Sequence, residues 1–430
     1  MENLLIRISL LGALVGLMAG WAVVAFRYII EWTQVWFLPG GSVGNYEGLP
    51  GWLRLALPVG GALLLGLIFE RLPAERRAVG VTHLLDYLRF RRERLPLRNA
   101  FVQFFGGVLT LVSGQSMDRE GPGVHIGAAT VSLFGPGFNL GEEDAYLLAA
   151  AGGAAAIAAA FNTPLAGVIF VIEVLRVRYE LNNIVPITVA AIVGTIVGRS
   201  VYGTEHLFAM SPVEIGSSAE LPVMLLMGVT IGLLAAGFML LVRTTARRTI
   251  DWRPLGAFLL AGLTTGVLAQ WAPQIMSLGY DALLRIFRSE LGVETLLLVL
   301  GAKLVATAVS VGARLPGGVI GPTLVMGGAV GGATELLFVQ WDALFVGNPG
   351  FYAIIGMVAM MGAVLRAPLA ALVALIELTG NLNIVLPGMI AVVAGEITTR
   401  ALVGDVSAFT VMLKVQHERE ALLAEPPSRH

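Results

Sequence analysis

Four ionisable side chains lie close together in a stretch of the chain that is otherwise strongly apolar. They occur between Ser113 and Gly127, and they are Asp118, Arg119, Glu120 and His125. A charged group inside a bilayer is costly, so an acidic residue in an apolar span indicates a route for an ion or a proton. We expect Glu120 to be that group, because a Gly-Pro-Gly break follows it directly.

This break, from Gly121 to Gly123, predicts the start of a helix. Proline lacks an N–H group and glycine turns freely, so the first N–H groups of the helix stay unpaired. Such a helix start attracts anions. A second Gly-Pro break lies 200 residues later, at Gly321 (321 − 121 = 200). We expect the two starts to face each other and to form an anion site from backbone N–H groups, with the Glu120 carboxylate competing for it. The alternative is an ion pair between Glu120 and Arg119 that only stabilises a helix end.

The composition indicates an all-helical integral membrane protein. Of 430 residues, 56% are hydrophobic and 13% are charged, with a mean hydropathy of +0.81, whereas soluble domains have about 25% charged residues. The absence of cysteine excludes disulfides and thiol chemistry. The net charge of −1 gives no indication of nucleic-acid binding. Motifs such as H-E-x-x-H and G-x-S-x-G are missing, so we expect neither an enzyme nor a bound metal or cofactor.

Apolar segments follow one another along the chain, and several are shorter than the ~20 residues of a perpendicular membrane helix. With 53 glycines and 20 prolines, they predict tilted helices and helices that end near the bilayer midplane. Leu4–Ile30 is too long for a signal peptide, so we expect a retained helix. Arginine-rich segments at 71–98 and 243–253 are predicted to be cytoplasmic, and 203–220, which has no Lys or Arg, external.

An internal repeat divides the chain. Phe161–Arg176 resembles Leu365–Gly380, with Glu173 and Glu377 at equivalent positions. Paired, interrupted apolar segments point to a transport site at the interface between two repeats. We predict an N-terminal helix and loop (1–50), a first membrane repeat (51–215), a second (216–410) and a short cytoplasmic tail (411–430). The tail is too short for a regulatory domain.

Three motifs resemble those of the CLC family of chloride channels and proton-coupled transporters. The D-R-E-G-P of Asp118–Pro122 is similar to the family's G-R-E-G-P, the segment Leu315–Leu324 to its G-x-F-x-P, and Phe161–Glu173 to its next membrane segment. The resemblance implies two inverted halves, an anion pathway in each subunit, a homodimer in a bacterial inner membrane, and a small inorganic anion, chloride first, as substrate. It makes Glu120 the gate. It also implies a set of anion-binding residues, which are Val79, Gly80, Arg119, Gly121, Gly318, Val319, Ile320 and Phe409.

The chain departs from the family at several of these positions. Val79 stands in place of the family's serine and Phe409 in place of its tyrosine, so two hydroxyl groups are lost. We therefore expect weaker or differently selective anion binding at the inner site, unless Thr82 replaces one hydroxyl. Ile320 replaces a phenylalanine. Asp118 replaces a glycine and adds a negative charge beside the route.

A further departure concerns protons. Val174 occupies the position of the exchangers' internal proton-transfer glutamate. Because valine carries no proton, we expect channel-like or weakly proton-coupled anion movement; the alternative is a proton/anion antiporter, for fluoride, bicarbonate or nitrate among others. Asp118, His125 and Glu173 are candidates for tuning or carrying a proton. For His125 the alternative is a packing role, and for Glu173 a role at a helix end. His83 is expected in a cytoplasmic loop.

Overall fold

The computed structural model describes residues 2–90, 95–134, 138, 140–205, 207–208, 220–339 and 350–424, and within them it is helical with no strand. The α-helices are α1 (Glu2–Phe37), α2 (Gly51–Arg71), α3 (Gly80–Phe90), α4 (Leu97–Val112), α5 (Glu120–Ala129), α6 (Glu142–Phe161), α7 (Pro164–Glu173), α8 (Leu181–Tyr202), α9 (Leu221–Thr249), α10 (Pro254–Leu268), α11 (Tyr280–Phe287), α12 (Val293–Gly312), α13 (Ile320–Val339), α14 (Phe351–Leu365), α15 (Pro368–Thr379), α16 (Val385–Val403) and α17 (Ala408–Ala424).

Helix lengths vary as the apolar segments predict. Among the described residues, seven helices are long and apolar enough to cross a membrane. Others, including α5, α7 and α15, have only 10 to 12 residues. Both α7 and α15 begin at a proline, which suits the first helical position because no intrahelical N–H bond is needed there. The expected mixture of spanning and interrupted helices is confirmed.

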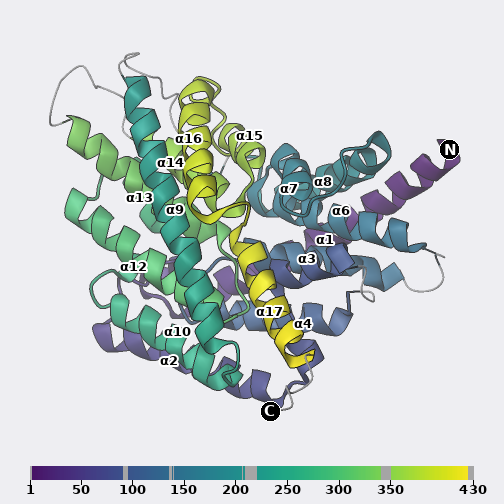
Figure 1. The fold of residues 1–430 in the computed structure, drawn as a ribbon, viewed down its shortest axis with the longest axis horizontal. Coiled ribbons are helices and arrows are strands. Elements are labelled where there is room, and N and C mark those ends of the chain that lie inside the picture. Colours follow the sequence, from purple (N-terminus) through teal and green to yellow (C-terminus); the bar gives the residue numbers. More distant parts are fainter. Residues whose placement is uncertain are drawn as a thin grey trace, which may run out of the picture.

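The helices pack as two equivalent sets. In the first set α1 packs on α8 and α5 on α6, and in the second α9 packs on α16 and α13 on α14. Glycine allows the close approach: a Cβ on Gly12 of α1 would lie 2.7 Å from a carbonyl oxygen of α8, and one on Gly228 of α9 would lie 2.5 Å from a carbonyl oxygen of α16. Figure 1 shows α2 and α10 side by side, and their contact joins the first half of the chain to the second. The residue boundaries of the repeats stay a prediction.

The two sets are also joined by reciprocal helix caps. The Glu173 carboxylate, at the end of α7, accepts hydrogen bonds of 3.1 and 2.7 Å from the N–H groups of Leu369 and Ala370 in α15. Glu377, near the end of α15, accepts bonds of 3.0 and 2.8 Å from the matching N–H groups of α7. Each carboxylate thus satisfies two N–H groups that the helix itself leaves unpaired. Both glutamates thus have the geometry of helix-end residues, which is the alternative to a proton-carrying role for Glu173.

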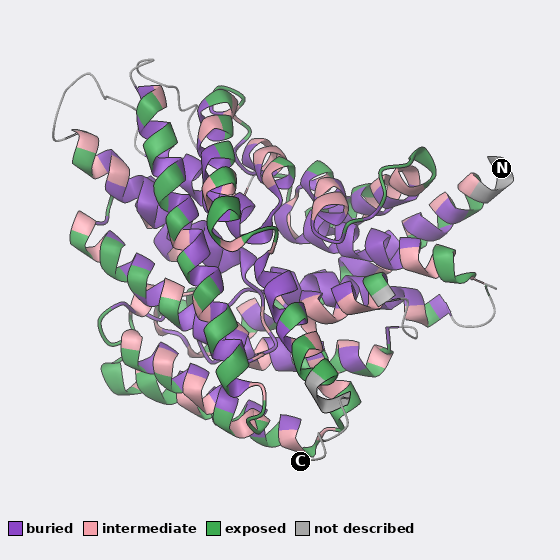
Figure 2. Cartoon of the chain, viewed as in Figure 1, coloured by how far each residue is buried: buried purple, intermediate pink, exposed green. Residues whose placement is uncertain are grey.

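Burial increases toward the centre of the molecule. Figure 2 shows the buried residues concentrated there, with exposed ones along the outer helices. All fifteen residues of α14 and all ten of α5 are buried. The C-terminal segment is not a loose tail, because α17 packs on α9 and α3. Arg91, Arg92 and Arg94 and most of 203–220 lie outside the described residues, so their predicted sides are untested.

Candidate anion site

The starts of α5 and α13 meet at the centre of the molecule. Just before them, Asp118 and Gly318 exchange two backbone hydrogen bonds, of 3.2 and 3.1 Å, as an isolated antiparallel bridge. The fit requires glycine, since a Cβ on Gly121 would lie 2.7 Å from the Cα of Gly318. The bridge therefore brings the N-terminal amides of two helices from different halves to one place.

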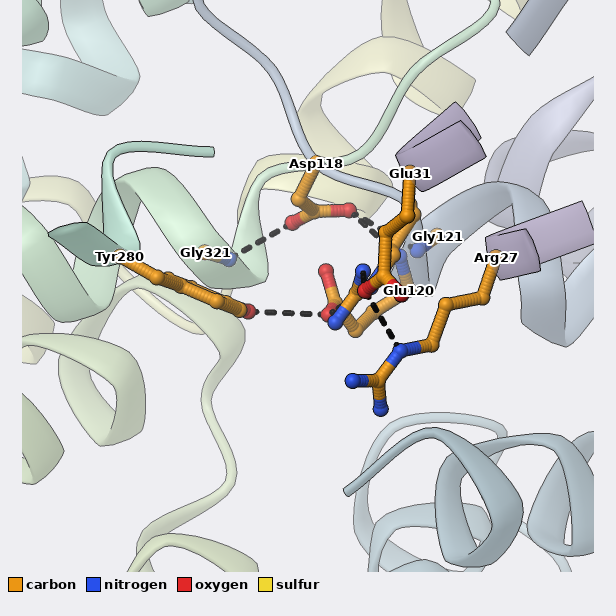
Figure 3. Close-up of polar contacts among 8 residues, drawn as sticks. Arg27, Glu31, Asp118, Glu120, Gly121, Tyr280 and Gly321 are labelled. Atoms are coloured by element: carbon orange, nitrogen blue, oxygen red, sulfur yellow. Dashed lines mark hydrogen bonds and ion pairs between the residues drawn. The ribbon is translucent and has the colours of Figure 1, made fainter. Parts of the chain in front are cut away.

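These amides are not bare, because the carboxylate of Asp118 lies on them (Figure 3). Its Oδ1 accepts hydrogen bonds of 3.0 Å from the N–H groups of both Glu120 and Gly121. Its Oδ2 accepts one of 2.7 Å from the N–H of Gly321. We call these three N–H groups the amide cradle. The sequence suggested that Glu120 is the carboxylate that occupies this position, whereas in the structure it is Asp118, which is fully buried.

The carboxylate of Glu120 forms its contacts with side chains and not with the cradle N–H groups. Its Oε1 accepts a hydrogen bond of 2.9 Å from the hydroxyl of Tyr280 and lies 3.5 Å from Nε of Arg119. Its Oε2 has no hydrogen-bond partner among the described residues. With 1% exposure, the residue faces neither solvent nor lipid. Glu120 therefore lies beside the cradle, held by side chains that a local movement could release, and its role as a gate stays a prediction.

A polar network continues from Glu120 toward the end of α1. Arg119 forms an ion pair of 2.8 Å with Glu31, which pairs at 2.7 Å with Arg27. The guanidinium of Arg27 lies 3.6 Å from the ring centre of Tyr202. Glu31 is 21% exposed, so the network reaches toward the surface. The pair of Arg27 and Glu31 was not predicted from the sequence, although an Arg and a Glu four residues apart in an apolar helix are a recognisable signal.

A cavity of about 990 Å³ lies next to the bridge, with Met117 and Gly317 in its lining. Val79, Gly80, Val319 and Phe409 line it, and so does Thr82. Its lining also includes four arginines, which are Arg77, Arg253, Arg314 and Arg419. All of them except Arg314 come from segments predicted to be cytoplasmic. We call it the inner cavity.

The predicted anion-binding residues thus fall into two groups. Arg119, Gly121 and Gly318 lie at the helix starts, and Val79, Gly80, Val319 and Phe409 lie at the inner cavity. Ile320 is the first residue of α13, next to Gly321 of the cradle, and it also contributes to a separate apolar pocket with Phe161 and Leu324. Its predicted part in anion binding stays a prediction.

Two histidines connect the inner cavity with α5. Nδ1 of His83 lies 2.9 Å from Nε2 of His125, a hydrogen-bond distance. His83 lines the inner cavity, and His125 is fully buried. The expectation that His83 lies in a loop is wrong, since it is in α3. Its pairing with His125 was not visible in the sequence because 42 residues separate them.

The predicted proton-transfer position is Val174. Val174 is buried directly after α7, and Glu173 is engaged as the cap of α15. Neither residue belongs to the lining of the inner cavity as described. Their roles in proton movement are not tested by the geometry.

Comparison with known proteins gives consistent matches along the chain. The model of a family described as "Voltage gated chloride channel" matches residues 60–400. A "putative chloride channel protein ClcB-like" of Ralstonia nicotianae is 31% identical over 432 residues, covering 97% of this chain and 99% of that protein. The "H(+)/Cl(-) exchange transporter ClcA" of Cronobacter sakazakii is 29% identical over 436 residues, covering 97% of this chain and 91% of that protein.

Solved structures share the fold. A slow cyanobacterial Cl⁻/H⁺ antiporter has a TM-score of 0.84 at 23% identity, covering 96% of this chain and 99% of its own. A CLC-type fluoride/proton antiporter has a TM-score of 0.76 at 22% identity, covering 95% of this chain and 98% of its own. The fold that the chain shares with these structures therefore extends over nearly its whole length.

Proposed function

Because the chain belongs to the voltage-gated chloride channel (CLC) family, we propose that it moves chloride or a similar small anion through a pathway inside each subunit. The expected all-helical membrane fold of CLC type, with two inverted halves, is confirmed. The observation that carries the proposal is the amide cradle. It offers partial positive charge from two helices, between the inner cavity and the polar network of α1.

We propose that the inner cavity is the cytoplasmic entrance and that its anion site is weak. An anion that leaves water needs donors to replace its hydration shell. The side chains of Val79 and Phe409 provide none, so backbone N–H groups and the hydroxyl of Thr82, which also lines the cavity, remain. Weak binding favours passage over retention.

The proposed gate is the carboxylate of Glu120. It lies beside the cradle, it is buried, and one of its oxygens lacks a hydrogen-bond partner among the described residues. If this side chain moves from Tyr280 into the cradle in place of Asp118, its negative charge competes with a passing anion for the N–H donors. Protonation, or displacement by the anion, removes that competition.

The coupling to protons has two candidate answers. The loss of an acid at Val174 favours channel-like or weakly coupled movement. The similarity to the exchange transporter ClcA and the pairing of His83 with His125 favour antiport to the same degree. In either case we propose a homodimer in a bacterial inner membrane, with anions, and protons in the second case, as its transported partners.

Liposomes loaded with one anion at a time, under an imposed pH gradient, distinguish these candidates. Passive conduction predicts anion efflux without uphill proton movement. Antiport predicts that a chloride or fluoride gradient drives protons against their own gradient. If no anion leaves faster than from protein-free liposomes, the proposed function is wrong.

A further inference from the structure

We propose that Asp118 is a tethered anion that occupies the outer binding position of the pathway, so that a permeating anion binds there only after this carboxylate has left. The inference rests on the proposed function and deepens it. It concerns which group fills the amide cradle in the resting protein. The ligands that compete with Asp118 are small monovalent anions such as chloride and bromide.

The contacts exceed what a helix cap requires. An ordinary N-terminal cap accepts hydrogen bonds from the N–H groups of its own helix, as Oδ1 of Asp118 does with Glu120 and Gly121. Oδ2 instead accepts the shortest of the three bonds, 2.7 Å, from Gly321 in the other half of the molecule. One carboxylate thus takes the donors that two facing helices would offer to a bound ion.

The surroundings fit the carboxylate closely. A Cβ on Gly321 would lie 2.9 Å from the Cβ of Asp118, and a Cβ on Gly318 would overlap Oδ1. Glycines from the second half therefore leave the space that the Asp118 side chain fills. Since this space lies against three N–H groups, an anion that replaces the carboxylate finds the same donors.

Electrostatics explain why a buried charge is tolerated here. Asp118 has no solvent exposure, and a buried carboxylate needs compensation. Two helix N-termini supply it, whereas the cationic group of neighbouring Arg119 is engaged by Glu31 and Glu120. The single carboxylate of Asp118 takes all three N–H donors of the cradle. While Asp118 fills it, Glu120 stays on the hydroxyl of Tyr280.

The test compares thermal stability in chloride with that in gluconate, an anion too large for the cradle. Asp118→Ala removes the tethered carboxylate, so chloride should bind and stabilise the folded state by mass action. We expect the melting temperature of the purified variant to rise by at least about 3 °C from gluconate to saturating chloride. The wild type should respond much less. A bromide-soaked crystal of the variant should show an anomalous peak within hydrogen-bond distance of the Gly121 and Gly321 N–H groups.

Glu335→Ala is the matched control. Glu335, in α13, is likewise a buried carboxylate that accepts a hydrogen bond from a backbone N–H, that of Gly350 at 3.0 Å, but it lies fourteen residues along the helix from Gly321 of the cradle (335 − 321 = 14). Its loss should lower the melting temperature equally in both anions. If Asp118→Ala behaves in the same way and shows no bromide in the cradle, Asp118 is only a cap of two helices and the inference is wrong.

A second variant keeps the test decisive if the alanine variant does not fold. Asp118→Asn has nearly the same shape without the charge: its amide oxygen can still accept from the Glu120 and Gly121 N–H groups, but its NH2 group cannot accept from Gly321, so that N–H is left for an anion. The same chloride dependence and bromide peak are expected, and their absence counts against the proposal. The result is separable from the proposed function: wild-type liposomes without anion flux contradict that function, whereas flux without these effects contradicts only the role of Asp118.

Discussion

The hydroxyl of Tyr280 is expected to hold the Glu120 carboxylate out of the anion route. Tyr280→Phe deletes this hydroxyl and keeps the ring, which packs edge-on against Phe208 at 5.7 Å. A hydrogen bond to a charged group contributes about 1.5 to 3 kcal/mol. At 1.4 kcal/mol for each factor of ten, its loss shifts the balance from held to released Glu120 by roughly 10- to 150-fold. The 3.5 Å contact with Arg119 remains, so the shift lies toward the lower figure.

The released carboxylate then competes with the anion. We expect chloride efflux from liposomes to fall by at least about threefold, with more chloride needed for half-maximal flux. In a Glu120→Gln background the same tyrosine change should have no such effect, because a neutral amide competes poorly. Equal losses in both backgrounds would refute the reasoning and assign Tyr280 to packing.

Tyr352→Phe provides the matched control for the loss of a buried tyrosine hydroxyl. Tyr352 donates a hydrogen bond of 2.9 Å to Glu220, and neither residue belongs to the cradle or the inner cavity as described. This variant should lose stability but keep the chloride dependence of the wild-type flux.

Three other predictions concern the inner cavity, the caps and the histidines. Val79→Ser adds a donor to the inner cavity and should tighten chloride binding roughly 2- to 12-fold by titration calorimetry, as one hydrogen bond of about 0.5 to 1.5 kcal/mol allows; unchanged affinity would remove Val79 from the pathway. Glu377→Ala leaves two helix N–H groups uncapped and should lower the free energy of unfolding by about 1 to 3 kcal/mol. Glu173→Ala should have the same effect. A Glu173→Ala variant that keeps its stability and loses only proton flux would contradict the capping role. His83→Phe removes the partner of His125 and should reduce any proton flux that accompanies chloride, seen with a pH dye; an unchanged proton flux would exclude the pair from a proton route.

Local signals in the sequence predicted the membrane class and the two helix starts. Gly121, Pro122 and their counterparts near Gly321 determine backbone geometry directly, because proline and glycine limit where a helix begins. The repeat was visible because equivalent packing, such as the caps formed by Glu173 and Glu377, requires the same residue at the same place.

The occupant of the site could not be predicted in this way. Whether Asp118 or Glu120 lies on the cradle depends on side-chain rotamers and on Tyr280, which approaches from α11, 160 residues along the chain. No local pattern encodes such a contact.

Chloride efflux from proteoliposomes, compared between the wild type and Glu120→Gln at one fixed pH, tests the central claim most directly. The account predicts efflux above that of protein-free liposomes for the wild type and faster efflux for the variant, since its neutral side chain no longer competes with the anion. Equal efflux from the two proteins, or none from the wild type, would contradict it.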